Sequence, residues 1–106
     1  MTYTIYALGD PRDGEIRYIG SCETPSLRYT QHLGNIKSRR QPLYEWLREL
    51  RSECLRPVMA VLYETEDSLD EYRSIVDFES AGCSLLNVVH RPVHNVLRNP
   101  ATRRKY

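Results

Sequence analysis

Three features of this sequence suit chemistry on a charged substrate. Tyrosine is abundant, with eight Tyr against one Phe and one Trp. Because a buried Tyr needs a partner for its hydroxyl, this excess indicates that some hydroxyls are used. Arg28 and His32 are four residues apart, which places both on one face of a helix. Glu71 falls inside the apolar stripe of another predicted helix, where an ionised carboxylate needs a cation, a metal ion or good donors.

Each feature also has a structural interpretation. Glu71 could sit at the edge of its stripe, or balance the positive N-terminal end of its helix, rather than hold a metal ion. We expect Tyr29, Tyr44 and Tyr63 in the core or at its rim. The pair formed by Tyr6 and Tyr18 differs because of the residues around it.

Residue patterns predict the elements that must position these side chains. Segments 2–8 and 16–22 read as a β-hairpin across a turn-rich loop; a loop centred near Arg12 places Tyr6 directly across from Tyr18. Helices are expected from Thr24 or Ser26 to about 37, over 43–55, and from 68 to about 81. On the last helix the apolar stripe excludes Ser74. Residues 57–64 read as a strand central in a small sheet, and 84–89 as an extended stretch.

The predicted fold class is therefore α/β, more strictly α+β. We expect a small three-stranded, mostly antiparallel sheet flanked by three helices in ββααβα order. A length of 106 residues allows one domain, over 1–89, followed by a basic tail over 90–106.

Composition narrows the functional class. With 41% apolar and 27% charged residues, the chain is an ordinary folded domain. Its apolar runs are too short to cross a bilayer and its start has no basic leader, so we expect no membrane contact. Cys22, Cys54 and Cys83 share no metal-binding or disulfide spacing, and a cytoplasmic protein with reduced thiols is expected.

Charge is segregated along the chain, although the net charge is only +1. Residues 26–56 carry seven Lys or Arg against three Glu, residues 57–89 one Arg against seven acids, and residues 90–106 five basic residues and no acid. A site that binds both a metal ion and a phosphate needs both signs close together, anions for the metal and cations for the phosphate.

Several motifs in the expected order resemble the GIY-YIG nuclease domain family, of a stand-alone, phage or mobile-element type. The resemblance runs from Tyr3 to about Val89. The first signature stands as Thr4-Ile5-Tyr6, with Thr4 in place of the first Gly, and the second as Tyr18-Ile19-Gly20. The further site positions of the family fall on Arg28, His32, Glu71 and Asn87. Some family members have a Lys near the first Tyr, and this hairpin has none.

This resemblance implies a metal-dependent DNA endonuclease that leaves 5′-phosphate and 3′-hydroxyl ends. Glu71 would hold Mg²⁺ or Mn²⁺, and Arg28 would clamp the phosphate. Tyr6 would act as general base, with Tyr18 or His32 hydrogen-bonded to Tyr6 or to the water. A phenol works as a base near neutral pH only where cationic neighbours lower its pKa. Asn87 would orient Glu71 or Tyr18.

DNA is the expected partner, with a homodimer or a separate specificity partner choosing the target. The expected nucleic-acid contacts are Arg17, Lys37, Arg39, Arg40, Arg91, Arg98, Arg103, Arg104 and Lys105. The main alternative is a catalytically silent module of the same fold that binds nucleic acid or a protein partner. A redox role for the isolated Cys22 is a third, weaker alternative.

Overall fold

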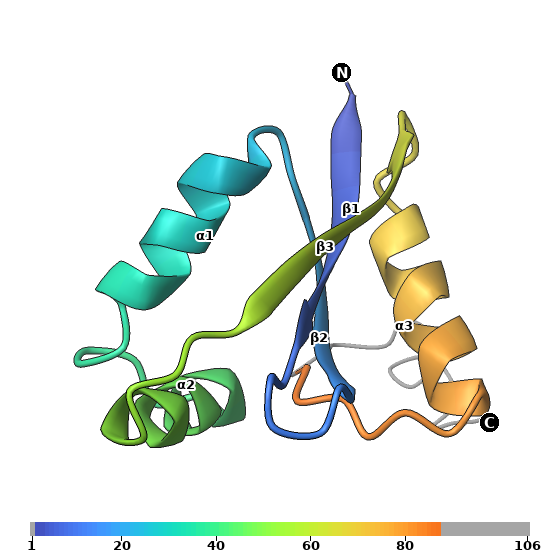
Figure 1. The fold of residues 1–106 in the computed structure, drawn as a ribbon. Coiled ribbons are helices and arrows are strands. Elements are labelled where there is room, and N and C mark those ends of the chain that lie inside the picture. The colour runs from blue at the N-terminus through green and yellow to red at the C-terminus, as the bar shows by residue number, and fades with distance from the viewer. Residues whose placement is uncertain (1, 88–106) are drawn as a thin grey trace, which may run out of the picture.

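The sequence folds into one antiparallel sheet with helices on both faces (Figure 1). The structure is a computed structural model and describes residues 2–87. Its elements are β1 (Tyr3–Gly9), β2 (Ile16–Cys22), α1 (Pro25–Gly34), α2 (Pro42–Ser52), β3 (Val58–Thr65) and α3 (Asp70–Ser80). The predicted α+β class and ββααβα order are confirmed. Residues 84–87 form no strand; positions 88–89 of that expected stretch and the basic tail lie outside the described residues.

The two faces of β1 supply two separate cores. Tyr6 and Leu8 point to the side of α1 and α2 and pack against Leu47 and Leu50. Ile5 and Ala7 point to the other side, where Ile19 and Ile75 of α3 complete a smaller cluster. Figure 1 shows α1 and α2 on one side of the strands and α3 on the other. Successive side chains of a strand alternate between faces, so β1 anchors both helical layers.

Within residues 2–87 no helix has the length and apolar character needed to span a bilayer.

The central strand is β1, and the prediction of a central third strand is wrong. The sheet order is β2-β1-β3, which leaves β3 at an edge. Val58 and Val61 of β3 are 56% and 58% exposed. A continuous apolar run resembles a strand covered on both faces, but it carries no information about which strand has two neighbours.

The register of the hairpin also differs from the prediction. Tyr6 lies opposite Gly20, and Tyr18 lies opposite Leu8. The cause is an irregularity after Leu8, where Gly9 pairs with Ile16 and Arg17 is an extra residue on β2. Such a bulge shifts all following pairs by one position. Tyr6 and Tyr18 are therefore diagonal neighbours on one face.

The helix boundaries match the prediction closely except at three ends. Helices α1 and α2 stop at Gly34 and Ser52, each three residues before the expected end, and α3 begins at Asp70 rather than Ser68. Gly82 has a positive φ of 103°, as expected for a residue that ends a helix. Ser74 is buried, against the prediction, and its hydroxyl lies 2.8 Å from that of Tyr63 on β3. A hydroxyl with such a partner can occupy a core position.

Candidate active site

A chain of three polar side chains lies buried between β1, α1 and α2. Tyr6 is fully buried, and its Oη lies 2.7 Å from Nε2 of His32. Nδ1 of His32 lies 3.2 Å from Oη of Tyr44 on α2. His32 thus has partners on both ring nitrogens, and the prediction that Tyr6 and His32 are neighbours in the site is met by this contact. Tyr44 was expected only as a core or rim residue.

The ring of Tyr18 completes an aromatic cluster around His32. Its centroid is 6.3 Å from that of Tyr6 and 5.5 Å from that of His32, with an edge-on arrangement to the imidazole. Tyr18 is half-buried whereas Tyr6 is buried. Of the two signature tyrosines, Tyr18 is therefore the one nearer to solvent.

Gly20 makes the space that Tyr6 occupies. A Cβ built on Gly20 would lie 2.5 Å from Cζ of Tyr6 and overlap its hydroxyl oxygen. Non-bonded carbon atoms normally stay about 3.5 Å or more apart. The glycine of Tyr18-Ile19-Gly20 is thus required by the side chain across the strand pair.

Burial controls the protonation of this cluster. It raises the pKa of Tyr6 far above its ordinary value, and the nearby Tyr18 adds to that effect. The pKa of Tyr18 rises to about 12 for the same main reason. Arg28 opposes both shifts but does not outweigh burial, so the cationic lowering of the Tyr6 pKa that general-base action requires is not present. Burial, aided by the charge of Arg28, lowers the pKa of His32 to about 4. At neutral pH the cluster is uncharged.

Charged side chains of opposite sign flank the tyrosines. Arg28 is half-buried, has no acidic partner within residues 2–87, and lines a cavity of about 330 Å³ with Ser21 and Gln31. The charge of Glu71 acts on the pKa of both Tyr6 and Tyr18. Arg28 and the hydrogen-bond partner of Glu71, Ser21, line the same cavity, so the α1 cation and the α3 anion approach it from two different elements.

Glu71 is available to a cation. Its Oε1 accepts a hydrogen bond of 2.6 Å from Oγ of Ser21, and in the described part of the chain it forms no ion pair. That part contains no group of three or more His, Cys, Asp or Glu arranged to hold a metal ion. Mg²⁺ is often held by one or two carboxylates and keeps most of its waters, so a lone half-buried carboxylate fits such an ion.

Asn87 bonds the backbone next to Tyr18 and makes no hydrogen bond to Glu71 in the described part of the chain. Its Oδ1 accepts from the Ile19 N–H at 3.0 Å, and its Nδ2 donates to the Ile19 carbonyl at 2.6 Å. Leu86 N also donates to the Arg17 carbonyl at 2.6 Å. Residues 86–87 therefore cover the outer edge of β2 and fix the residue between Tyr18 and Gly20.

The other expected nucleic-acid contacts are dispersed. Arg17 forms ion pairs with Asp10 and Asp13 in the hairpin loop, which engage its guanidinium away from the tyrosines. Lys37, Arg39 and Arg40 are exposed in the segment between α1 and α2. The remaining expected contacts, Arg91, Arg98, Arg103, Arg104 and Lys105, lie outside the described residues.

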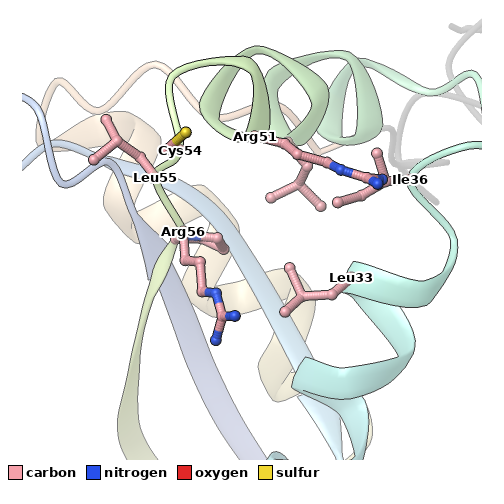
Figure 2. A pocket seen from close by; sticks show the side chains of 8 residues that line it. Leu33, Ile36, Arg51, Cys54, Leu55 and Arg56 are labelled. Atoms are coloured by element: carbon pink, nitrogen blue, oxygen red, sulfur yellow. The ribbon is translucent and has the colours of Figure 1, made fainter.

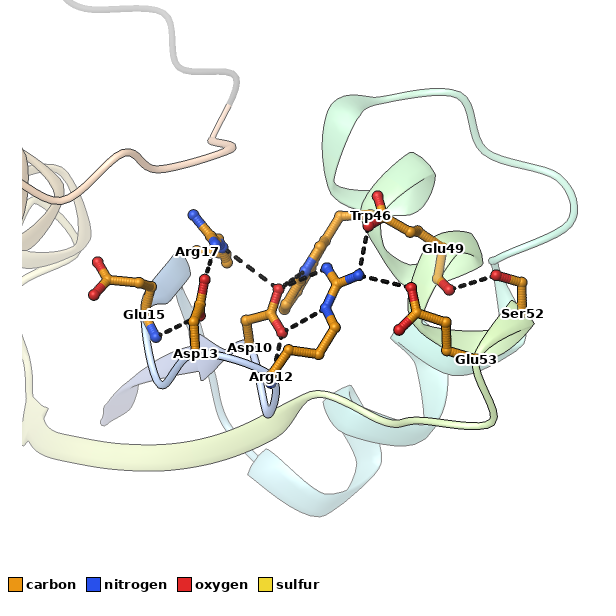
Figure 3. A network of polar contacts seen from close by, with 9 residues as sticks. All are labelled: Asp10, Arg12, Asp13, Glu15, Arg17, Trp46, Glu49, Ser52 and Glu53. Atoms are coloured by element: carbon orange, nitrogen blue, oxygen red, sulfur yellow. Dashed lines mark hydrogen bonds and ion pairs between the residues drawn. The ribbon is translucent and has the colours of Figure 1, made fainter.

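The hairpin loop is tied to α2 by a network that the sequence analysis missed (Figure 3). Asp10 is only 2% exposed and accepts from the Trp46 indole at 2.9 Å and from the backbone and side chain of Arg12. These donors hold the pKa of Asp10 well below its usual range. Arg12 also bonds Glu49 and Glu53 of α2. A buried indole N–H needs an acceptor, and that requirement on Trp46 was the available signal.

A larger hollow lies away from the tyrosines (Figure 2). Its volume is about 450 Å³, and none of the candidate catalytic side chains lines it. Leu33 near the end of α1 and Ile36 just after that helix contribute apolar wall, and the guanidinium of Arg56 points into the space beside Leu33. Cavity size alone would therefore point away from the tyrosine cluster.

Comparisons of this chain with protein-family models, with curated proteins and with solved structures returned no match.

Proposed function

We propose that this protein is a metal-dependent DNA endonuclease that hydrolyses phosphodiester bonds at the Tyr6–His32 cluster. The observation that carries the proposal is the 2.7 Å contact between Tyr6 Oη and His32 Nε2, with Arg28 and Glu71 both acting on the same phenols. Phosphodiester hydrolysis needs an activated water, positive charge at the phosphoryl oxygens and help for the leaving oxygen.

Proton removal from water would run through Tyr6 to His32. Tyr6 is not a phenolate before the reaction, because burial raises its pKa and keeps the hydroxyl protonated. Because Tyr6 has no exposed surface, the proton would reach it through Tyr18, which is nearer to solvent and hydrogen-bonded to Tyr6. Tyr18 would take a proton from water and pass its own to Tyr6, while the proton of Tyr6 passes to Nε2 of His32. This transfer requires the tautomer in which Nδ1 carries the hydrogen and donates to Tyr44 Oη, which lies 3.2 Å away. A neutral histidine, with its pKa lowered to about 4, is in the correct state to accept at neutral pH.

Arg28 and Glu71 would supply the phosphate binding and the metal binding that the reaction also needs. The Arg28 guanidinium binds the scissile phosphate and offsets charge that develops on its oxygens. Glu71, steadied by Ser21, would hold Mg²⁺ or Mn²⁺. When bound, such an ion supplies Lewis-acid stabilisation of the phosphate and the leaving oxygen. Tyr18, nearer to solvent than Tyr6, can hydrogen-bond to the attacking water.

Nicking of supercoiled plasmid with Mg²⁺ or Mn²⁺ tests the proposal. Wild type should nick, and Glu71→Ala, Arg28→Ala and Tyr6→Phe should each lose about 100-fold or more, the range for removing a charge-stabilising or proton-transferring group. Glu66→Ala and Arg51→Ala are matched controls, because both replace exposed charged residues outside the cluster. Equal cutting by Glu71→Ala would remove the metal assignment.

The silent binding module makes a different prediction in the same experiment. It requires DNA binding with a steep dependence on salt and no nicking with any divalent metal. The elevated pKa of Tyr6 is the feature that favours this alternative, because it denies the site a ready phenolate. A cytoplasmic location and DNA as partner belong to the same proposal.

A further inference from the structure

One edge of the sheet is covered by hydrogen bonds and the other edge is open within residues 2–87. Residues 86 and 87 cover the edge of β2 with hydrogen bonds to Arg17 and Ile19. Strand β3 has β1 as its neighbour on one side, and within residues 2–87 no backbone group bonds its other side. An uncovered strand edge is a template for pairing with another strand.

Neither helical layer overhangs the β3 edge. Val61 pairs with Tyr6 and so lies on the face of α1 and α2, whereas Val58 pairs with Gly9 and lies on the α3 face. They are 58% and 56% exposed, and Figure 1 shows β3 running across the front of the sheet. The edge is therefore accessible from both faces. It also lacks the lysines that commonly protect such edges.

We infer that β3 pairs antiparallel with β3 of a second copy of this chain, in a register centred on Ala60. In that register Val58 faces Leu62 of the second copy, and Met59 faces Val61. Met59 and Val61 lie on the α1–α2 face, opposite Leu8 and Tyr6. Leu62 packs on the α3 side, and Val58 is on that side as well. Both of these facing pairs thus share a face, and the bulge at Leu62 lies at the end of the paired stretch.

Charge complementarity supports this register. Continued beyond the start of β3, it brings Arg56 near Glu64 of the second copy, and two-fold symmetry makes this pair twice. Arg56 points into the hollow beside Leu33, on the α1–α2 side (Figure 2), and Glu64 pairs with Thr4 on the same face. Neither has an ion-pair partner in the described part of its own chain. Opposite charges at facing positions stabilise an antiparallel pair, and like charges destabilise it.

The dimer would place both tyrosine clusters on the same side of one continuous sheet, because antiparallel pairing preserves the faces. The two β1 strands would be three strand spacings apart, about 14 Å. Only this consequence rests on the proposed nuclease function. Two sites on one surface would cut both strands of a duplex in one encounter.

Charge exchange tests the interface. Wild type should show dimers by sedimentation velocity at about 100 μM, a concentration suited to a small interface. Arg56→Glu and Glu64→Arg, each confirmed as folded by circular dichroism, should each dimerise at least about ten-fold more weakly, because each single variant opposes like charges at both symmetric positions. An equimolar mixture of the two variants should recover dimerisation, since both contacts of the mixed dimer are again complementary.

A wild type that stays monomeric, single variants that dimerise as wild type does, or a mixture without recovery would each overturn the inference. Sedimentation does not depend on catalysis, so a monomeric protein that nicks DNA would refute the dimer and keep the nuclease. A protein that dimerises but never cuts DNA would refute the nuclease and keep the dimer.

Discussion

The ring of Tyr6 lies against Gly20, directly across the β1–β2 pair, in space that any side chain at position 20 would fill. This contact links the two tyrosine-bearing segments of the sequence. It keeps the Tyr6 hydroxyl at 2.7 Å from His32 and leaves the diagonal neighbour Tyr18 at the rim.

Gly20→Ala should therefore displace Tyr6 and abolish its contact with His32. We expect about 100-fold less nicking, as for a misplaced reacting group, and a loss of about 1–3 kcal/mol in the free energy of unfolding from overpacking. Plasmid nicking and urea denaturation measure the two effects. Gly34→Ala is the matched control, because a Cβ there meets no atom within 4 Å. Unchanged nicking by Gly20→Ala would show that the Tyr6 position is not critical.

The buried neutral His32 makes stability depend on pH. Its folded pKa of about 4 lies below the ordinary 6.5, so the unfolded chain takes up a proton first as pH falls. Stability should be greatest above pH 6.5 and decline until pH 4, by about 3 kcal/mol in total. His32→Gln has no such group, and urea denaturation across this range should show a shallower decline. If the stability of wild type and of His32→Gln declined equally with falling pH, His32 would not be buried in its neutral form.

Asp10 also makes the free energy of unfolding depend on pH, in a lower pH range than His32. Because its folded pKa is depressed, the stability that it contributes is present above about pH 4 and is lost only as pH falls further. Asp10→Asn at pH 7 should cost about 3 kcal/mol, since it breaks a buried charge contact and leaves Arg12 without its main partner. Chemical denaturation measures this loss. Glu53→Gln, at an exposed carboxylate of the same network, should change stability by less than about 1 kcal/mol.

Asn87→Ala should lower both stability and activity. The substitution removes two hydrogen bonds to Ile19, one with its N–H and one with its carbonyl. We expect the free energy of unfolding to fall by about 1–3 kcal/mol. Because Ile19 lies between Tyr18 and Gly20, we expect nicking to fall about ten-fold or more as the site loosens. Asn87→Asp should be no better, since a carboxylate cannot donate to the Ile19 carbonyl. Wild-type nicking by both variants would limit Asn87 to a structural role.

The sequence patterns predicted the elements well and their neighbours poorly. Turn residues, proline at the start of α2 and apolar spacing are local signals, so the strands and helices appear where expected. The predicted register was wrong because the bulge adds Arg17 to β2 as an extra residue, and no local sequence pattern shows that insertion. The position of β3 failed because pairing order is a property of the whole sheet.

The candidate site shows the same division. Residue types and spacing identified Tyr6, His32 and Arg28, which lie close together because two elements carry them all. The role of Tyr44 was missed, because a hydroxyl on a core helix face looks like any other core residue until its partner is known. The contact of Asn87 with the Ile19 backbone was also missed, since backbone partners leave no trace in side-chain patterns.

The Tyr6–His32–Tyr44 chain holds three hydrogens for two contacts, so one hydrogen always points out of it. With hydrogen on Nδ1, the outward hydroxyl is that of Tyr44; with hydrogen on Nε2, it is that of Tyr6. The chain therefore has a polarity that reverses as a unit. In one polarity Tyr6 withdraws a proton, and in the other it presents one to an oxygen. A proton that enters at the Tyr6 end leaves imidazolium at His32, with a hydrogen on each ring nitrogen. Reversal of the polarity then requires the outward hydrogen of Tyr44 to leave the chain. Return of the proton from Nε2 through Tyr6 to the departing oxygen would restore the starting polarity without that loss.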